Sequence, residues 1–260
     1  MPRRFDPDYR QRPLSRRSVL EWLGKATVLA LGADLAAACT RRSGPGIVDA
    51  SSGGDGMTAG PGDAAGDVPM AFEPGGAGLA IYDDWNVRTV DPQDLEEILA
   101  TWKLRVDGMV ESPRTYTFAD LLALPRQDQV TDFHCVEGWS VLDVPWNGVH
   151  LSTLLAAAGP RPGATHITFH TMRGEYDESL PMPVALEPRT LLAYGAGGST
   201  LPLAHGFPLR LVVPRLYAYK SAKYVQRIEV RDVATEGYWV AAGYPYDGEV
   251  PESRLRPGRY

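Results

Sequence analysis

The chain has 260 residues, of which 44% are hydrophobic, and a formal net charge of −6 at pH 7. This composition can supply a substantial core, whereas the acidic balance argues against a nucleic-acid partner, because phosphate binding requires a clustered basic surface. The sequence shows no internal repeat and no segment long and apolar enough to be an ordinary transmembrane span.

Residues 1–38 have the pattern of a twin-arginine export signal. Arg16 and Arg17 precede a moderately apolar run from Trp22 to Ala38. The alternative is an amphipathic helix that follows two arginines by chance. Because the twin-arginine route exports folded proteins, often with a cofactor already inserted, the pattern favours a cofactor enzyme of the periplasm or cell-envelope surface.

Cys39 follows three alanines, as the acylated cysteine does in a lipoprotein signal. We therefore expect either a lipid anchor through Cys39 or plain cleavage that releases a soluble exported protein. Residues 39–80 are rich in Gly, Ser, Asp and Pro. Such a segment cannot bury enough apolar surface to fold, so we expect a flexible tether before one folded domain at residues 81–260.

The folded part begins with alternating residues that predict a strand at 102–106, followed by a turn at Asp107-Gly108. Further along the chain the sequence predicts a helix at 118–124 with Thr117 as its N-cap, a strand at 129–133 that ends just before Cys135, a turn within 146–150, a helix from Ser152 that Gly159-Pro160 ends, and strands at 166–170, 209–213 and 225–230. Strands, short helices and many Gly and Pro turns together predict a mixed α+β domain.

Cys135 is the only cysteine in the body of the chain, since the other of the two is Cys39. It could be a buried structural thiol, a metal ligand or a hydrolytic nucleophile. Against the nucleophile, no Cys/His/Asn pattern of a hydrolase surrounds it, and the adjacent His134 would point to the other side of an extended strand.

A basic segment follows at residues 201–230, with a His-Gly turn, an arginine on a strand and two lysines on the next loop. Cationic side chains, a histidine and the free N–H groups of a Ser-Ala turn could together surround a phosphate-bearing ligand. The alternative is a pair of strands with solvated basic residues. The residues concerned are His205, Arg210, Lys220, Ser221 and Lys223.

The segments "DFHCVEGWS", "LPLAHGFPLRLVVP" and "YKSAK", in this order and spacing, resemble the molybdopterin-binding domain of the sulfite oxidase family. That family includes bacterial members without a haem domain and the periplasmic methionine-sulfoxide reductase catalytic subunit. The C-terminal "GYWVAAGYPYDGEVPESR" is similar to the end of the same domain, so the resemblance covers about Tyr82 to Tyr260. It implies a sulfite oxidase-type α+β fold and a molybdenum-molybdopterin cofactor.

By the same resemblance, Cys135 is the single protein ligand to molybdenum, and the pterin supplies two further sulfurs. A soft thiolate suits such a metal. Tyr244 lies five residues after Trp239, as an active-site tyrosine does in the family, although it could equally pack its ring under a C-terminal loop. Arg88 is a further catalytic candidate beside the metal. The cofactor-binding positions implied are Asn86, Arg88, Cys135, Thr171, His205, Arg210, Ser221, Ala222 and Lys223, whereas His134, His150, His166 and His170 are interpreted as structural or surface residues.

The resemblance implies two-electron oxygen-atom transfer on a small sulfur oxyanion or a sulfoxide. The "HGFP" loop favours sulfite oxidation, and sulfoxide reduction is the alternative. An anionic substrate would need a cationic pocket, for which Arg173 is a candidate unless it lies on a surface turn. The sequence has no c-type haem motif and no cytochrome b5-like segment, so we expect a separate redox partner, either a cytochrome or a membrane subunit. A cofactor-free binding lipoprotein is the hypothesis from another functional class.

Overall fold

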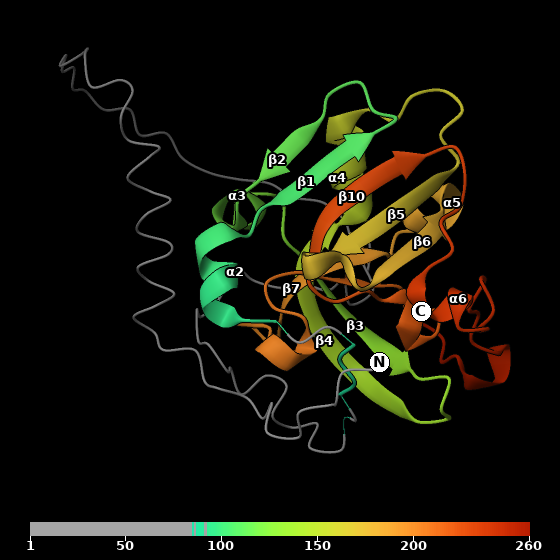
Figure 1. The fold of residues 1–260 in the computed structure, drawn as a ribbon. Coiled ribbons are helices and arrows are strands. Elements are labelled where there is room, and N and C mark those ends of the chain that lie inside the picture. Colours follow the sequence, from blue (N-terminus) through green and yellow to red (C-terminus); the bar gives the residue numbers. More distant parts are fainter. Residues whose placement is uncertain (1–84, 86, 91–92) are drawn as a thin grey trace, which may run out of the picture.

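The computed structural model describes Trp85 and residues 87–90 and 93–260 (Figure 1). The export signal with Arg16 and Arg17, Cys39, the expected tether and Asn86 therefore lie outside the described residues. Within the described ranges, no helix has the length and apolar character needed to cross a membrane.

Five strands form the first sheet, in the order β2 (Arg114–Tyr116), β1 (Leu104–Gly108), β10 (Val225–Arg231), β5 (His166–Thr171) and β6 (Asp177–Pro181). The pair β1 and β10 is parallel, and the other neighbours are antiparallel. Figure 1 shows β1, β10, β5 and β6 side by side. Leu104 and Val106 are fully buried while Arg105 between them is exposed, so one face of this sheet covers the core.

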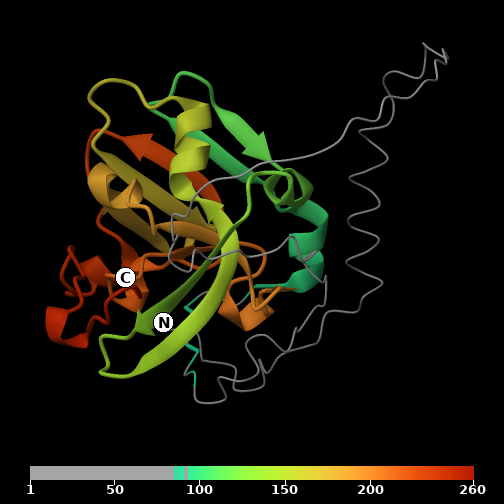
Figure 2. The same ribbon diagram turned by 180° about the vertical axis from the view of Figure 1, so that it is seen from behind.

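The second sheet has the order β3 (Gln127–His134), β4 (Ser140–His150), β7 (Leu191–Ala196) and β8 (Ser199–Thr200), and β9 (Arg210–Val212) also pairs with β7. Its β3–β4 hairpin is long and curved and extends beyond the first sheet (Figures 1 and 2). The pairing of β3 with β4 shifts register between Thr131 and Phe133. Such a bulge bends a strand and changes the direction of its side chains, here just before Cys135.

The helices are α2 (Leu95–Thr101), α3 (Phe118–Leu122), α4 (Leu151–Ala158), α5 (Met182–Ala185) and α6 (Tyr238–Ala241). At α3, the side chain of Thr117 accepts from the Asp120 N–H, and the Asp120 carboxylate accepts from the Thr117 N–H. This reciprocal cap confirms the predicted N-terminus of the helix. Two sheets with short helices confirm the predicted α+β class.

Two predicted turns are wrong. Asp107 and Gly108 belong to β1 and pair with Glu229 and Val230 of β10. Residues 146–150 belong to β4. Glycine is required at position 148 by close packing and not by a turn, because a Cβ there would lie 2.2 Å from the Leu192 carbonyl oxygen. Glycine in both segments therefore permits a close backbone approach between strands, a role that a local turn rule does not distinguish.

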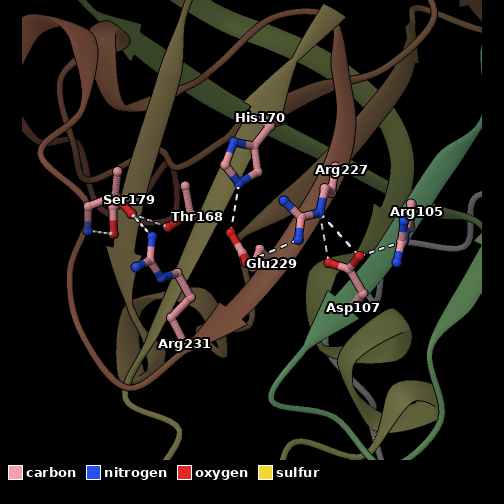
Figure 3. Close-up of polar contacts among 9 residues, drawn as sticks. Arg105, Asp107, Thr168, His170, Ser179, Arg227, Glu229 and Arg231 are labelled. Atoms are coloured by element: carbon pink, nitrogen blue, oxygen red, sulfur yellow. Dashed lines mark hydrogen bonds and ion pairs between the residues drawn. The ribbon is translucent and has the colours of Figure 1, made fainter. Parts of the chain in front are cut away.

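A ladder of alternating charges crosses the first sheet on the face away from the core (Figure 3). Its members come from β1, β10 and β5, and each basic side chain contacts a carboxylate. The contacts are Arg105 to Asp107 at 2.5 Å, Arg227 to Asp107 at 2.9 Å, Arg227 to Glu229 at 3.0 Å and His170 to Glu229 at 3.0 Å. We call these five residues the charge ladder.

Candidate active site

A cavity of about 990 Å³, its open mouth included, lies at the end of β3. The structure brings together eight of the predicted site residues in its lining, namely Arg88, Cys135, Thr171, His205, Arg210, Ser221, Lys223 and Tyr244. Ala222 is not part of the lining, because its side chain is buried elsewhere and its carbonyl accepts from the Leu211 N–H.

Cys135 immediately follows β3 and is half-buried at the cavity wall. Among the residues that the structure describes, it has no disulfide partner. Burial raises the pKa of its thiol, and the charge of Glu137 acts in the same direction. In the described part of the chain, no three His, Cys, Asp or Glu side chains gather closely enough to hold a metal ion. A metal at Cys135 would take its remaining ligands from a cofactor.

Glu137 lies beside the thiol, with its Oε2 atom 3.9 Å from the Cys135 Sγ. The carboxylate accepts a hydrogen bond from Trp139 Nε1 at 3.1 Å and forms an ion pair with Arg88 at 2.8 Å. These two donors lower the pKa of Glu137. The positive charge of Arg88 is therefore already matched by a carboxylate.

Two further cations line the cavity, the buried Arg210 and the half-buried Lys223. The guanidinium of Arg210 donates to the carbonyls of His205, Ser221 and Leu211 at 3.1–3.4 Å. The ammonium of Lys223 donates to three oxygens, those of the Arg88 carbonyl (2.7 Å), the Thr89 hydroxyl (2.7 Å) and the Ala204 carbonyl (3.0 Å). Among the described residues, neither cation has a carboxylate partner.

The pKa values of Arg210 and Lys223 are both lowered, because burial disfavours a positive charge that no carboxylate compensates. Burial lowers the pKa of Arg210 to about 10. Burial and the charge of Arg210 lower the pKa of Lys223 well below its usual value. An anion bound between them would offset both effects, since an opposite charge favours the charged form of each group.

His205 and Gly206 form the turn that brings these cations together. Burial, with the charges of Arg210 and Lys223, lowers the pKa of His205 to about 3, so its ring is neutral at pH 7. Gly206 has φ +108°, and a Cβ there would lie 3.0 Å from the Arg210 Cβ and 3.1 Å from the Lys223 Cγ. Only glycine adopts this conformation without strain and leaves both side chains in place.

Two details of the basic segment differ from the sequence-based expectation. Lys220 does not face the cavity: its ammonium forms a fully buried ion pair with Glu178 at 2.5 Å and donates to the Ser179 carbonyl at 2.8 Å. The Ser221 N–H is not free either, because it donates to the Ala218 carbonyl at 3.0 Å. The Ser221 hydroxyl accepts from the Val213 N–H at 3.2 Å.

Aromatic side chains form part of the cavity wall. The ring of Tyr244 packs against Trp239 and Tyr219, each with centroids 5.4 Å apart. Within the described ranges the Tyr244 hydroxyl has no hydrogen-bond partner, so it is available to a bound molecule. The hydroxyl of Thr171, in contrast, donates to the Tyr176 carbonyl at 2.6 Å.

The other residues weighed from the sequence lie outside the cavity. Arg173 pairs with Glu97 at the surface at 2.7 Å, in agreement with a surface turn. The histidines interpreted as structural or surface residues, His134, His150, His166 and His170, are absent from the lining of this cavity.

A family profile described as "Oxidoreductase molybdopterin binding domain" matches residues 89–239. The chain belongs to this family. It is 38% identical over 153 residues to the uncharacterized oxidoreductase YuiH of Bacillus subtilis, which covers 59% of this chain and 77% of YuiH.

Two further relatives extend this result. The chain is 38% identical over 155 residues to the protein-methionine-sulfoxide reductase catalytic subunit MsrP of Gluconobacter oxydans, covering 53% of this chain and 49% of MsrP. The sulfane dehydrogenase SoxCD of Paracoccus pantotrophus has a similar structure, with a TM-score of 0.52 and 28% sequence identity over 57% of this chain and 42% of that chain. The chain thus spans about half of MsrP, and the resemblance to the sulfite oxidase family is confirmed.

The residues present fit a molybdopterin cofactor. The buried Arg210 and the half-buried Lys223 lack a carboxylate partner among the described residues, which suits the phosphate end of the pterin. Cys135, in the lining of the same cavity, offers a thiol that a metal would hold as the thiolate.

Several lining residues had no role in the sequence-based prediction, above all Glu137, Trp85 and Tyr219. The signal for Glu137 was its position two residues after Cys135. Trp85 is buried against the rings of His205 and Phe133, with centroids 4.6 Å and 5.1 Å away, and no sequence pattern joins these three segments.

Proposed function

We propose that this chain reduces a small, uncharged organic sulfoxide to the thioether, with a molybdenum cofactor bound through Cys135. The membership of the molybdopterin-binding family supports oxidoreductase chemistry. The name of the relative MsrP supports sulfoxide reduction in preference to the sulfite oxidation that the "HGFP" loop favoured.

The observation that carries the choice of substrate is the Glu137 carboxylate, 3.9 Å from the Cys135 Sγ. A doubly charged sulfite ion would be repelled by this carboxylate, and the neighbouring Arg88 is already paired with it at 2.8 Å. The aromatic wall of Tyr219, Trp239 and Tyr244 suits a neutral sulfur compound, because sulfur makes favourable contacts with aromatic rings.

When bound, the molybdenum cofactor supplies two-electron oxygen-atom transfer. In this proposal Cys135 holds the metal, while Arg210 and Lys223 bind the phosphate end of the pterin. The neutral His205 supports Arg210 through its carbonyl at 3.1 Å. Tyr244 donates a hydrogen bond from its hydroxyl to the sulfoxide oxygen and so weakens the sulfur–oxygen bond that the transfer would break. Glu137 holds Arg88 and Trp139 at the mouth.

The overall reaction consumes one sulfoxide, two electrons and two protons and yields one thioether and one water. We propose that the electrons come from a separate redox protein, as the designation "catalytic subunit" of MsrP suggests for that relative. We also propose the twin-arginine route of export to the cell envelope. Fractionation of cells that express the chain with Arg16 and Arg17 both changed to Lys tests this, since normal export of the variant would contradict it.

The substrate is tested with cofactor-loaded protein in two assays, one with a dialkyl sulfoxide and a reduced viologen dye, the other with sulfite and ferricyanide. We expect kcat/KM to be at least roughly tenfold higher for the sulfoxide. In Glu137→Gln, a neutral variant of similar shape, sulfite turnover should rise relative to sulfoxide turnover. A wild-type preference for sulfite would overturn the substrate assignment.

The metal ligand is tested by elemental analysis and by Cys135→Ser. Wild-type protein should contain about one molybdenum per chain, whereas a cofactor-free binding protein would contain none. Cys135→Ser should keep its thermal stability but lose turnover, because a hydroxyl is a harder and less readily ionised ligand than a thiolate. An unchanged molybdenum spectrum and unchanged turnover in Cys135→Ser would contradict the assignment.

A further inference from the structure

The turn that carries Cys135 has few stabilising contacts of its own. The Cys135 N–H donates to the Trp139 carbonyl at 3.0 Å, and the Gly138 N–H donates to the Cys135 carbonyl at 3.2 Å. Val136, Glu137 and Gly138 are exposed. Within the turn, Trp139 Nε1 also donates to the Glu137 carboxylate at 3.1 Å. So few hydrogen bonds in an exposed turn leave its conformation, and hence the direction of the Cys135 side chain, weakly determined.

Arg254, more than a hundred residues later in the chain, binds both ends of this turn. Its Nη2 atom donates to the carbonyls of Gly138 (3.2 Å) and Trp139 (3.1 Å) and to the Ser140 hydroxyl (2.9 Å). Its Nη1 atom approaches the Cys135 carbonyl at 3.4 Å. A planar guanidinium with several fixed donors can hold such a set of oxygens, which the single ammonium of a lysine cannot.

The segment that carries Arg254 is itself fastened to the β3–β4 hairpin. Arg256 binds the buried Asp132 with its Nε atom at 2.6 Å, whereas the exposed pair of Arg259 with Asp143, also at 2.6 Å, contributes little. The Asp132 N–H, at the bulge of β3, donates to the Arg259 carbonyl at 3.2 Å. Figures 1 and 2 both show the C-terminal segment beside this hairpin. These contacts hold the backbone at Arg254 in a fixed position relative to the Cys135 turn.

We infer that Arg254 is a positioning residue that fixes the Cys135 turn in the conformation that binds the cofactor. This inference rests on the proposed role of Cys135 as metal ligand. Arg254 lies outside residues 89–239, which the family profile matches, and acts on the site only through the backbone of the turn.

The test compares Arg254→Gln, Arg254→Lys and the control Arg259→Gln, which removes a cation from the same segment without touching the turn. In cofactor-free protein, hydrogen exchange of the Cys135 and Gly138 amides should become about tenfold faster in Arg254→Gln, because the carbonyls that anchor the turn lose their donors. Arg254→Lys should restore this protection only in part, and Arg259→Gln should match the wild type.

In the loaded protein, the electron paramagnetic resonance spectrum of Mo(V) should change in Arg254→Gln and remain unchanged in Arg259→Gln. Unchanged exchange and an unchanged spectrum in Arg254→Gln would overturn the inference. If that variant does not fold, the same two measurements on Arg254→Lys decide, and wild-type results there would equally overturn it. Failure of the proposed function is distinguishable, because it would show as an unchanged spectrum in Cys135→Ser whatever the exchange rates are.

Discussion

The charge ladder and the cavity both contain basic side chains. In the ladder these side chains are paired with carboxylates, whereas among the described residues Arg210 and Lys223 of the cavity are not. In the ladder, Arg227 meets Asp107 at 2.9 Å and Glu229 at 3.0 Å (Figure 3). In the cavity, the buried Arg210 and the half-buried Lys223 donate to backbone carbonyls and one hydroxyl. A buried charge is costly unless it is paired, so an anion bound from outside the chain would stabilise the cavity.

This difference in partners indicates a difference in role: a cation paired with a carboxylate supports the fold, whereas a cation without one is available to an anionic ligand. The ladder carries its own compensating charges and contributes modestly to stability, as partly exposed pairs do. The cavity has positive charge where a ligand phosphate would lie, which solvated surface lysines would not provide. Replacing one cation in each region by a neutral residue tests the two roles separately.

The largest effect is expected for Lys223→Met. Removal of a charged donor from a buried phosphate costs about 1.5–3 kcal/mol, which corresponds to tenfold or more in cofactor retention. Molybdenum and pterin contents of the purified protein measure it. Arg227→Met in the ladder is the matched control and should retain the wild-type contents. Full occupancy in Lys223→Met, or equal losses in both variants, would show that the comparison between the regions is mistaken.

The second prediction concerns His205, whose pKa burial and the two cavity cations lower to about 3. Below the pKa of about 6.5 that an unfolded histidine has, the unfolded chain binds a proton that folded His205 does not. The stability contribution is thus complete above about pH 6.5 and falls by about 1.4 kcal/mol per pH unit towards pH 3.

Urea unfolding of cofactor-free wild type and His205→Gln at pH 7, 6 and 5 measures this slope. The difference in unfolding free energy between the two proteins should change with pH, because the variant lacks the titrating ring. A difference that stays constant over this range would mean that His205 titrates normally in the folded chain.

The smallest effect is expected for Glu229→Gln in the ladder. Burial opposes ionisation of Glu229, but the hydrogen bond with His170 and the charge of Arg227 outweigh it and lower its pKa. Its contribution should be at most about 1 kcal/mol at pH 7 and should be lost as the pH falls through this lowered pKa. Unfolding at pH 7 and pH 3 measures it, and a loss of cofactor in this variant would be inconsistent with a purely structural ladder.

The sequence predicted the elements that have local signals. The cap of α3 at Thr117, the strand that ends before Cys135 and the helix that ends at Gly159 all depend on neighbouring residues, and the structure confirms them. The failures concern contacts between distant segments. Nothing local reveals that Gly148 faces the backbone of β7, or that Lys220 pairs with Glu178 while Lys223 faces the cavity.

The same limit holds for the site. Its ligand-type residues lie in short motifs and were found, whereas Trp85 and Arg254 reach the cavity or the Cys135 turn from the two flanks of the domain. Their side chains are common types without a distinctive spacing. Only the folded chain shows what they contact.

The contacts of Arg254 also bear on the order of folding. The hydrogen bonds from Arg254 to the Cys135 turn close a loop of more than a hundred residues, with sequence separations of 114–119. Closure of so long a loop costs more entropy than formation of the local β3–β4 hairpin, so the turn should acquire its final shape late. Cofactor insertion would then require a domain that has already folded around the cavity, and the metal would not serve as a nucleus for folding.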